Sequence, residues 1–111
     1  MHVVRFLRIQ QDKVDRVRAW FHELQSRRSE VLATFLQEGT HSESVHLLQG
    51  KDGPLLVYVM EVDDLERARR AYAESTLPID IEHKAVMASC TNGRATTEVL
   101  FECSMKNRTL G

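Results

Sequence analysis

The segment LLVYVMEV, residues 55–62, constrains the fold more than any other part of the chain. It is apolar at almost every position until Glu61, whereas a strand with one face in water alternates apolar and polar residues. We therefore expect a strand that is covered on both faces. The chain's own helices can cover one face, and we predict that a second copy of the chain covers the other.

Three further segments have the composition or position of strands. They are residues 3–9, residues 40–49 and residues 95–105. The sequence GKDGP, residues 50–54, has the glycines and the Asp-Gly pair of a tight turn. Residues 40–49 and 55–62 are therefore predicted to pair as a hairpin.

Three helices are predicted in the two longer connections between these strands. Apolar side chains recur every three or four positions over residues 12–36, which predicts one long helix, and Gly39 can end it. Asp63 and Asp64 can cap a second helix. A shorter helix is predicted to start at Asp80 and to run to about Ser89.

The order of these elements predicts the fold class. Without the short helix it is βαββαβ, the ferredoxin-like α+β arrangement, with a four-stranded antiparallel sheet and helices on one face. The chain has 111 residues, a common size for one domain. We expect a single domain over residues 1–106 and a frayed C-terminal tail over residues 107–111.

Charge, hydropathy and cysteine content argue against several classes of protein. The chain has 15 Lys and Arg against 16 Asp and Glu, so it lacks the basic excess of a nucleic-acid-binding protein. No apolar run approaches the roughly 20 residues that span a membrane, and because arginines interrupt the first apolar stretch we expect no signal peptide. Cys90 and Cys103 lack disulfide or zinc spacing, so we expect reduced thiols in a cytoplasmic protein.

Three stretches resemble a known group of proteins: LQEGTHSESV (residues 36–45), VYVMEVDDLERAR (57–69) and YAESTLPIDIEH (72–83). With the element order and the apolar strand, they resemble small uncharacterised bacterial proteins of the dimeric α/β-barrel superfamily. The resemblance implies a homodimer whose two sheets face each other around a cavity. Members range from cofactor-free monooxygenases to proteins without a known role, so the fold does not fix the function.

Asp80 and His83 are the leading candidates for chemistry, and two interpretations of them stay open. In the structural one, Asp80 is the N-cap of the short helix and its carboxylate accepts hydrogen bonds from backbone amides, which contributes roughly 1 kcal/mol. In the catalytic one, Asp80 orients His83 as a general base. A capping carboxylate points at its own helix, which favours the structural interpretation.

Four more residues are candidates for a site. Strict alternation places His41 and Glu43 on one face of their strand, where they could reach a cavity, although their spacing is not a metal motif and we predict no metal site. Tyr58 is the polar tip of an apolar strand and could mark a cavity wall or be a core residue. Arg5 could meet an anionic ligand or pair with the glutamates of the last predicted strand.

The sequence therefore predicts a homodimeric protein that binds a small molecule between facing sheets, without a cofactor, a nucleic acid or a membrane as partner. One alternative is a cofactor-independent enzyme, of monooxygenase or isomerase type, with His83 or His41 as its base. Another is a purely structural dimer. An enzyme should bury an imidazole beside a pocket, a binding protein should have a mainly apolar pocket, and a structural dimer should have none large enough for a ligand.

Overall fold

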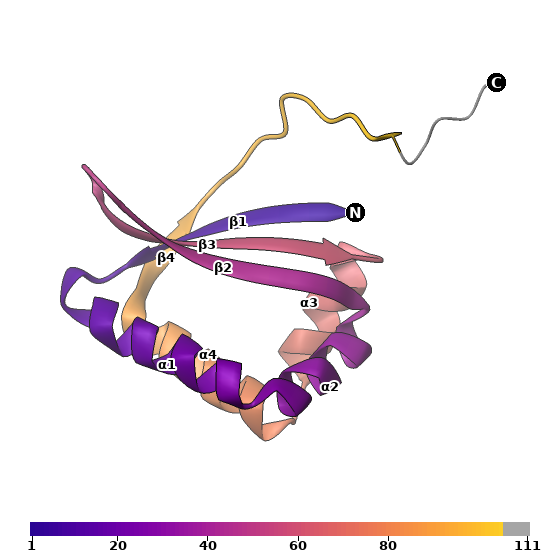
Figure 1. The fold of residues 1–111 in the computed structure, drawn as a ribbon, viewed down its shortest axis with the longest axis horizontal. Coiled ribbons are helices and arrows are strands. Elements are labelled where there is room, and N and C mark those ends of the chain that lie inside the picture. The colour runs from indigo at the N-terminus through magenta and orange to yellow at the C-terminus, as the bar shows by residue number, and fades with distance from the viewer. Residues whose placement is uncertain (106–111) are drawn as a thin grey trace.

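The computed structural model describes residues 1–105, which form one antiparallel sheet and a layer of helices. Along the chain the elements are β1 (His2–Ile9), a short 3-10 helix η1 (Gln11–Lys13), α1 (Val14–Ser26), α2 (Arg28–Glu38), β2 (Thr40–Gly50), β3 (Gly53–Val62), α3 (Leu65–Glu74), α4 (Pro78–Cys90) and β4 (Thr91–Ala95). The strands are ordered β2-β3-β1-β4 (Figure 1). The predicted ferredoxin-like α+β class is confirmed.

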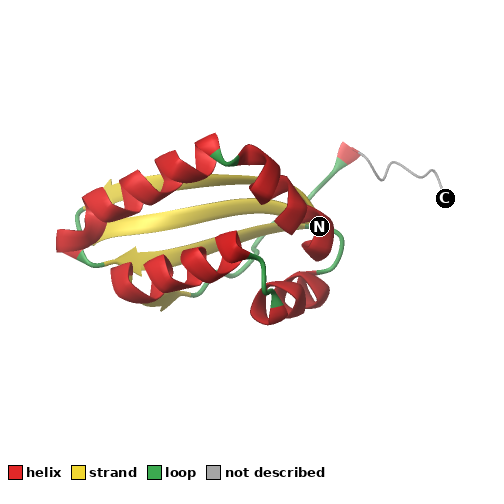
Figure 2. Cartoon of the chain, turned by 90° about the horizontal axis from the view of Figure 1, so that it is seen from below, coloured by secondary structure: helices red, strands yellow, loops and turns green. Residues whose placement is uncertain are grey.

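All four α-helices cover the same face of the sheet (Figure 2). The reason lies in the alternation of β3, where Leu56, Tyr58 and Val62 are buried and the residues between them are less so. α1 and α4 add their own apolar stripes to this face. The hydrophobic core is made of Ile9, Val14, Val17, Trp20, Leu56, Tyr58, Val86 and Cys90.

The opposite face of the sheet has exposed apolar side chains among its polar ones, and no helix covers it in the single chain. Val59 is 38% exposed, and Val4, its partner on β1, is 41% exposed. Leu48 on β2 is 49% exposed. The helices thus cover one face of β3, as expected, while cover of the other face by a second copy stays a prediction.

The long helix predicted over residues 12–36 is wrong, because the chain breaks it at Arg27. This residue has φ −109° and ψ 42°, outside the helical region, and α2 begins in a new direction after it. The segment QSRRSE, residues 25–30, contains no apolar side chain. Core packing therefore does not hold the helix straight at this point.

The last strand predicted over residues 95–105 is also wrong. β4 ends at Ala95, and residues 96–105 leave the sheet on the side opposite the helices (Figure 1). Leu100 and Phe101 in this arm are each 86% exposed. A strand-like composition is not sufficient to form a strand, because a strand also needs a neighbouring strand to pair with. Within residues 1–105 the arm has no such neighbour. Consequently Arg5 forms no ion pair with Glu98 or Glu102.

None of the helices in residues 1–105 is long and apolar enough to cross a membrane.

Candidate ligand-binding site

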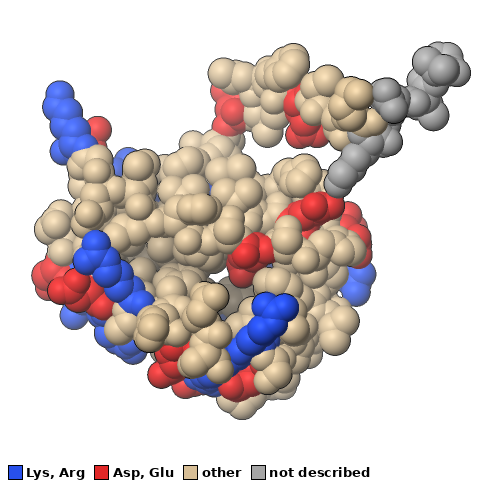
Figure 3. All heavy atoms as spheres, viewed as in Figure 1, with Lys and Arg blue, Asp and Glu red and all other residues tan. Residues whose placement is uncertain are grey.

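A cavity of about 650 Å³ lies between the helix-covered face of the sheet and the helices. Figure 3 shows the molecule hollowed between these layers, with acidic side chains at the edge of the hollow. The volume falls within the usual range for small-molecule sites. The cavity lies inside one chain, on the other side of the sheet from the face where a second subunit was predicted to enclose one.

Every strand and every α-helix contributes to the cavity wall. The apolar and aromatic part consists of Leu7, Phe21, Leu24, Val31, Tyr58, Met60, Leu65, Ala68, Tyr72, Ala73, Ile79 and Met87. The polar and charged part consists of Arg5, Thr34, Glu38, Thr40, Glu43, Arg69, Asp80, His83 and Arg94. A mostly apolar wall with a few converging polar groups is typical of sites for small organic molecules.

His83 is held by hydrogen bonds at both ring nitrogens. The indole Nε1–H of Trp20 donates to Nδ1 at 2.8 Å, and Nε2 lies 3.0 Å from the hydroxyl of Tyr58. Because indole can only donate, Nδ1 must be unprotonated, and the neutral ring then carries its hydrogen on Nε2. His83 therefore donates to the oxygen of Tyr58.

The surroundings of His83 keep it neutral. Burial of the ring lowers the pKa of His83 to about 4, and the negative charge of Asp80 opposes this only in part. Protonation would also place a hydrogen on Nδ1, facing the N–H of Trp20. With that lone pair engaged and the other nitrogen protonated, His83 has no free basic site, which argues against its predicted role as a general base.

Tyr58 is left as a hydrogen-bond donor at the cavity wall. Its side chain is buried, with 9% exposed, and burial raises the pKa of its hydroxyl, so the group stays protonated. Its oxygen accepts from His83, and among residues 1–105 its own hydrogen has only the sulfur of Met87, at 3.7 Å, as an acceptor. Thioether sulfur is a weak acceptor. A ligand oxygen or nitrogen in the cavity could therefore replace it.

Asp80 fits neither interpretation of the sequence. α4 begins two residues earlier, at Pro78, because proline is well suited to the first helical position, and the N-cap is Leu77. Asp80 thus lies in the first turn, is 5% exposed, and forms no hydrogen bond with His83 within residues 1–105. Its Oδ2 atom is buried without a hydrogen-bond partner among the described residues.

Two glutamates lie on the same cavity wall. Burial raises the pKa of Glu38 to about 7, and the hydrogen bond that its Oε1 accepts from Thr40 at 3.1 Å offsets this only in part. Partial removal from water also raises the pKa of Glu43 to about 7, although its side chain remains accessible to solvent through the cavity. The negative charge of Glu38 also raises the pKa of Glu43, the positive charge of Arg5 opposes this, and the charge of Asp80 raises the pKa of both glutamates.

The positive side of the cavity is formed by Arg5, Arg69 and Arg94. Burial, followed by the charges of Arg94 and Arg69, lowers the pKa of Arg5, so the three guanidinium groups lie near one another. Arg5 pairs across the ladder with Tyr58, one strand away from β2, which carries Glu43. Within residues 1–105 no ion pair joins these arginines to the cavity carboxyls.

His41 lies outside the cavity, contrary to the alternation that placed it beside Glu43. Thr40 pairs with Val62 and Ser42 pairs with Glu61, so residue 41 is the extra residue of a β-bulge. The bulge turns its side chain to the surface. There its Nε2 lies 2.6 Å from Oδ1 of Asp63, and this hydrogen bond lowers the pKa of Asp63.

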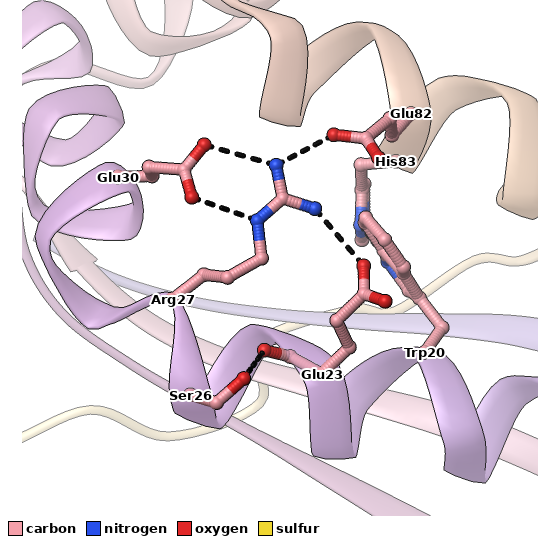
Figure 4. Close-up of polar contacts among 7 residues, drawn as sticks. All are labelled: Trp20, Glu23, Ser26, Arg27, Glu30, Glu82 and His83. Atoms are coloured by element: carbon pink, nitrogen blue, oxygen red, sulfur yellow. Dashed lines mark hydrogen bonds and ion pairs between the residues drawn. The ribbon is translucent and has the colours of Figure 1, made fainter.

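Arg27, which lies outside the cavity, links α4, the helix that carries His83, to α1 and α2. Arg27, at the break between α1 and α2, binds both carboxylate oxygens of Glu30 at 2.8 and 2.9 Å, Glu23 at 2.9 Å and Glu82 at 2.6 Å (Figure 4). Its guanidinium carbon also lies 6.0 Å from the ring centroid of Trp20. Sequence reasoning missed this contact because Glu82 is 55 residues away.

The structure thus brings together five of the six residues singled out in the sequence. Arg5, Glu43, Tyr58, Asp80 and His83 all line the cavity, and His41 does not. Among residues 1–105, no group of three or more His, Cys, Asp or Glu side chains is arranged to hold a metal ion.

Comparison with known proteins finds one protein family, described as a family of unknown function (DUF6176), which matches residues 1–109. No curated protein matches the chain.

Proposed function

Since the chain belongs to the DUF6176 family of unknown function, we propose its role from geometry: it is a homodimeric protein that binds a small, largely apolar molecule in the cavity of each subunit. The observation that carries the proposal is the cavity of about 650 Å³. Sites for small organic molecules are typically concave spaces of this size with a mostly apolar wall and a few converging polar groups. A solvent-accessible space with this wall is therefore a feature that a ligand would explain.

The hydrogen bonds of the wall support binding over catalysis. His83 is neutral, donates through Nε2 and accepts through Nδ1, so neither nitrogen can take a proton from a substrate without losing a bond. Tyr58 can donate to a ligand but, with its raised pKa, is not a base at neutral pH. The cavity itself argues against a purely structural dimer, which needs no such space.

The homodimer is supported by surfaces that the single chain leaves open. The uncovered face of the sheet presents Val4, Val59 and Leu48, and the arm over residues 96–105 carries Leu100 and Phe101, both 86% exposed. The arm leaves on that same side of the sheet (Figure 1). A second copy could shelter both surfaces, and contiguous exposed apolar surface commonly marks an interface.

Binding can be tested with Nile red, an uncharged apolar dye that fluoresces when it leaves water. We expect saturable binding of one dye per chain. Ala73→Trp places a large ring at an exposed part of the cavity wall and should abolish this binding. Ala88→Trp makes the same change at an exposed position of α4 outside the cavity, and should leave it intact. Equal binding by the two variants would contradict the proposal, because the dye would then occupy another surface.

A further inference from the structure

Asp80 is the most deeply buried charged residue of the cavity, and one of its carboxyl oxygens accepts no hydrogen bond from residues 1–105. Asp80 is 5% exposed, and its Oδ2 atom has no hydrogen-bond donor within residues 1–105. Buried polar atoms in folded proteins are nearly always hydrogen-bonded, so each exception calls for an explanation. A donor carried by a ligand would satisfy this oxygen.

Two more carboxyls lie close enough to interact with Asp80. Glu38 and Glu43 line the same cavity, and the charge of Asp80 raises the pKa of each. Glu38 also raises the pKa of Glu43. The three groups therefore repel one another when ionised, and a positive charge placed among them would turn this repulsion into attraction.

The surroundings of the three carboxyls suit an organic cation better than a metal ion. The ring of Tyr72 interacts electrostatically with all three of them and lines the cavity. Aromatic faces attract cations that are partly removed from water, and this ring already has Nζ of Lys84 5.0 Å from its centroid. Met60 and Ile79 supply apolar wall nearby, against which the hydrocarbon part of a ligand can pack.

Within residues 1–105 the arginines of the cavity form no ion pair with these carboxyls, and only the charge of Arg5 partly offsets the raised pKa of Glu43. Arg69 and Arg94 are exposed to solvent, and Arg5 is only partly buried. In the sheet order β2-β3-β1-β4, Glu43 is on β2, whereas Arg5 and Arg94 are on β1 and β4. The cavity is thus divided into a positive side and a negative side.

We propose that the cavity binds a protonated amine on an apolar or aromatic body, with its ammonium group held by Asp80, Glu38 and Glu43. The inference rests on the proposed function, because it names the ligand class of the same cavity. The ammonium group donates to Oδ2 of Asp80, and the aromatic or apolar body lies towards Tyr72 and Met60.

The test compares three probes of similar size by isothermal titration calorimetry at neutral pH. They are phenethylamine, which is a cation, phenethyl alcohol, which is neutral, and phenylacetate, which is an anion. We expect phenethylamine to bind at least about tenfold more tightly than the alcohol, as for a charge-assisted hydrogen bond, and phenylacetate to bind most weakly. Equal binding of amine and alcohol, or tighter binding of phenylacetate, would overturn the inference and leave the proposed function standing. Binding of none of the three would overturn both.

Two variants locate the ammonium group. Asp80→Asn keeps the size of the side chain and removes its charge, so it should reduce the preference for amine over alcohol by about tenfold while the alcohol still binds. Asp52→Asn makes the same change in the exposed turn between β2 and β3 and should leave the preference unchanged. Glu43→Gln provides a second removal of charge on the solvent-accessible side of the cavity, so loss of folding in one variant does not decide the result. If both cavity variants retain the full preference, the assignment is wrong.

Discussion

Trp20 fixes the protonation state of His83, because its indole N–H donates to Nδ1 at 2.8 Å and leaves Nε2 as the ring's only N–H. We expect two-dimensional NMR of ¹⁵N-labelled protein to show His83 as the neutral tautomer protonated at Nε2 at pH 7 and at pH 5, since burial lowers its pKa to about 4. Trp20→Phe removes the donor and should raise the pKa of His83 and lower the free energy of unfolding by roughly 1–2 kcal/mol. Tyr58→Phe keeps the Trp20 bond and should preserve the tautomer. A ring protonated at Nδ1 in the native protein would contradict this account.

Glu43 should make the protein less stable as the pH rises. Its pKa is about 7 in the folded chain and 4.5 in the unfolded one, so between these values the folded state binds more protons and stability falls with increasing pH. Glu43→Gln cannot ionise and escapes this loss. Relative to the native protein, the variant should therefore gain about 1 kcal/mol between pH 4 and pH 8, a figure reduced because Glu43 is accessible to solvent.

Urea denaturation at several pH values measures this difference. His83 also titrates in the same range, but it is present in both proteins and cancels in the comparison. Glu74→Gln, at an exposed position of α3, serves as the control and should show no such trend. A gain that is largest at low pH would show that Glu43 is ionised more readily in the folded state than in the unfolded one.

Arg27 should stabilise the packing of α4 against the break between α1 and α2. It joins Glu23, Glu30 and Glu82, which lie on three different helices. Arg27→Ala leaves three carboxylates without their shared cation and should lower the midpoint of thermal unfolding, and the loss should shrink in high salt. Arg28→Ala, at the neighbouring exposed position, should leave the midpoint nearly unchanged. Equal effects of the two substitutions would show that Arg27 only contributes general surface charge.

The sequence predicts the fold well because its strongest signals are local. The unbroken apolar run before Glu61, the Asp-Gly turn and Gly39 each determine an element within a few residues of themselves. The break at Arg27 escapes this reasoning because residues 25–30 have no apolar side chain from which the path of the chain could be predicted, and the partner of Arg27 on α4, Glu82, is 55 residues away. A sustained apolar period shows that residues are helical, but it does not show that the helix is continuous.

For the candidate site too, local sequence patterns predict some features, whereas contacts between distant residues determine the others. Five of the six predicted residues line the cavity. They could be predicted because their residue types are unusual at their positions: an arginine, a glutamate and a tyrosine on strands, and the Asp80 and His83 pair. Their partners were not predictable. The donor to His83 is Trp20, 63 residues away, and a single bulged residue turns His41 out of the site. Side-chain pairing across the fold is set by tertiary packing, which local patterns do not encode.

Gly39 should be required for the turn from α2 into β2. It has φ +72°, in the left-handed region, and its N–H bonds to the carbonyl of Phe35 to close the helix. A Cβ at this position would lie 3.1 Å from Nη1 of Arg67 and 3.3 Å from Oδ2 of Asp63. Gly39→Ala should therefore lower the free energy of unfolding by about 1–2 kcal/mol. Gly50→Ala meets nothing within 4 Å and has no positive φ, so it should be neutral or slightly stabilising.

The uncovered face of the sheet should decide the state of assembly. We expect the chain to sediment as a dimer at micromolar concentrations, with Val59 and Val4 buried against the second copy. Val59→Asp places a charge on this face in both subunits and loses apolar burial on the order of 2 kcal/mol per subunit, so the variant should sediment as a folded monomer. Leu36→Asp, at a position of α2 that is 81% exposed, should leave the dimer intact. Because the cavity lies within one chain, a monomeric Val59→Asp variant should still bind Nile red. If the native protein is monomeric at these concentrations, the proposed dimer is refuted. Ligand binding in the cavity of a single chain would then be the only remaining part of the proposed function.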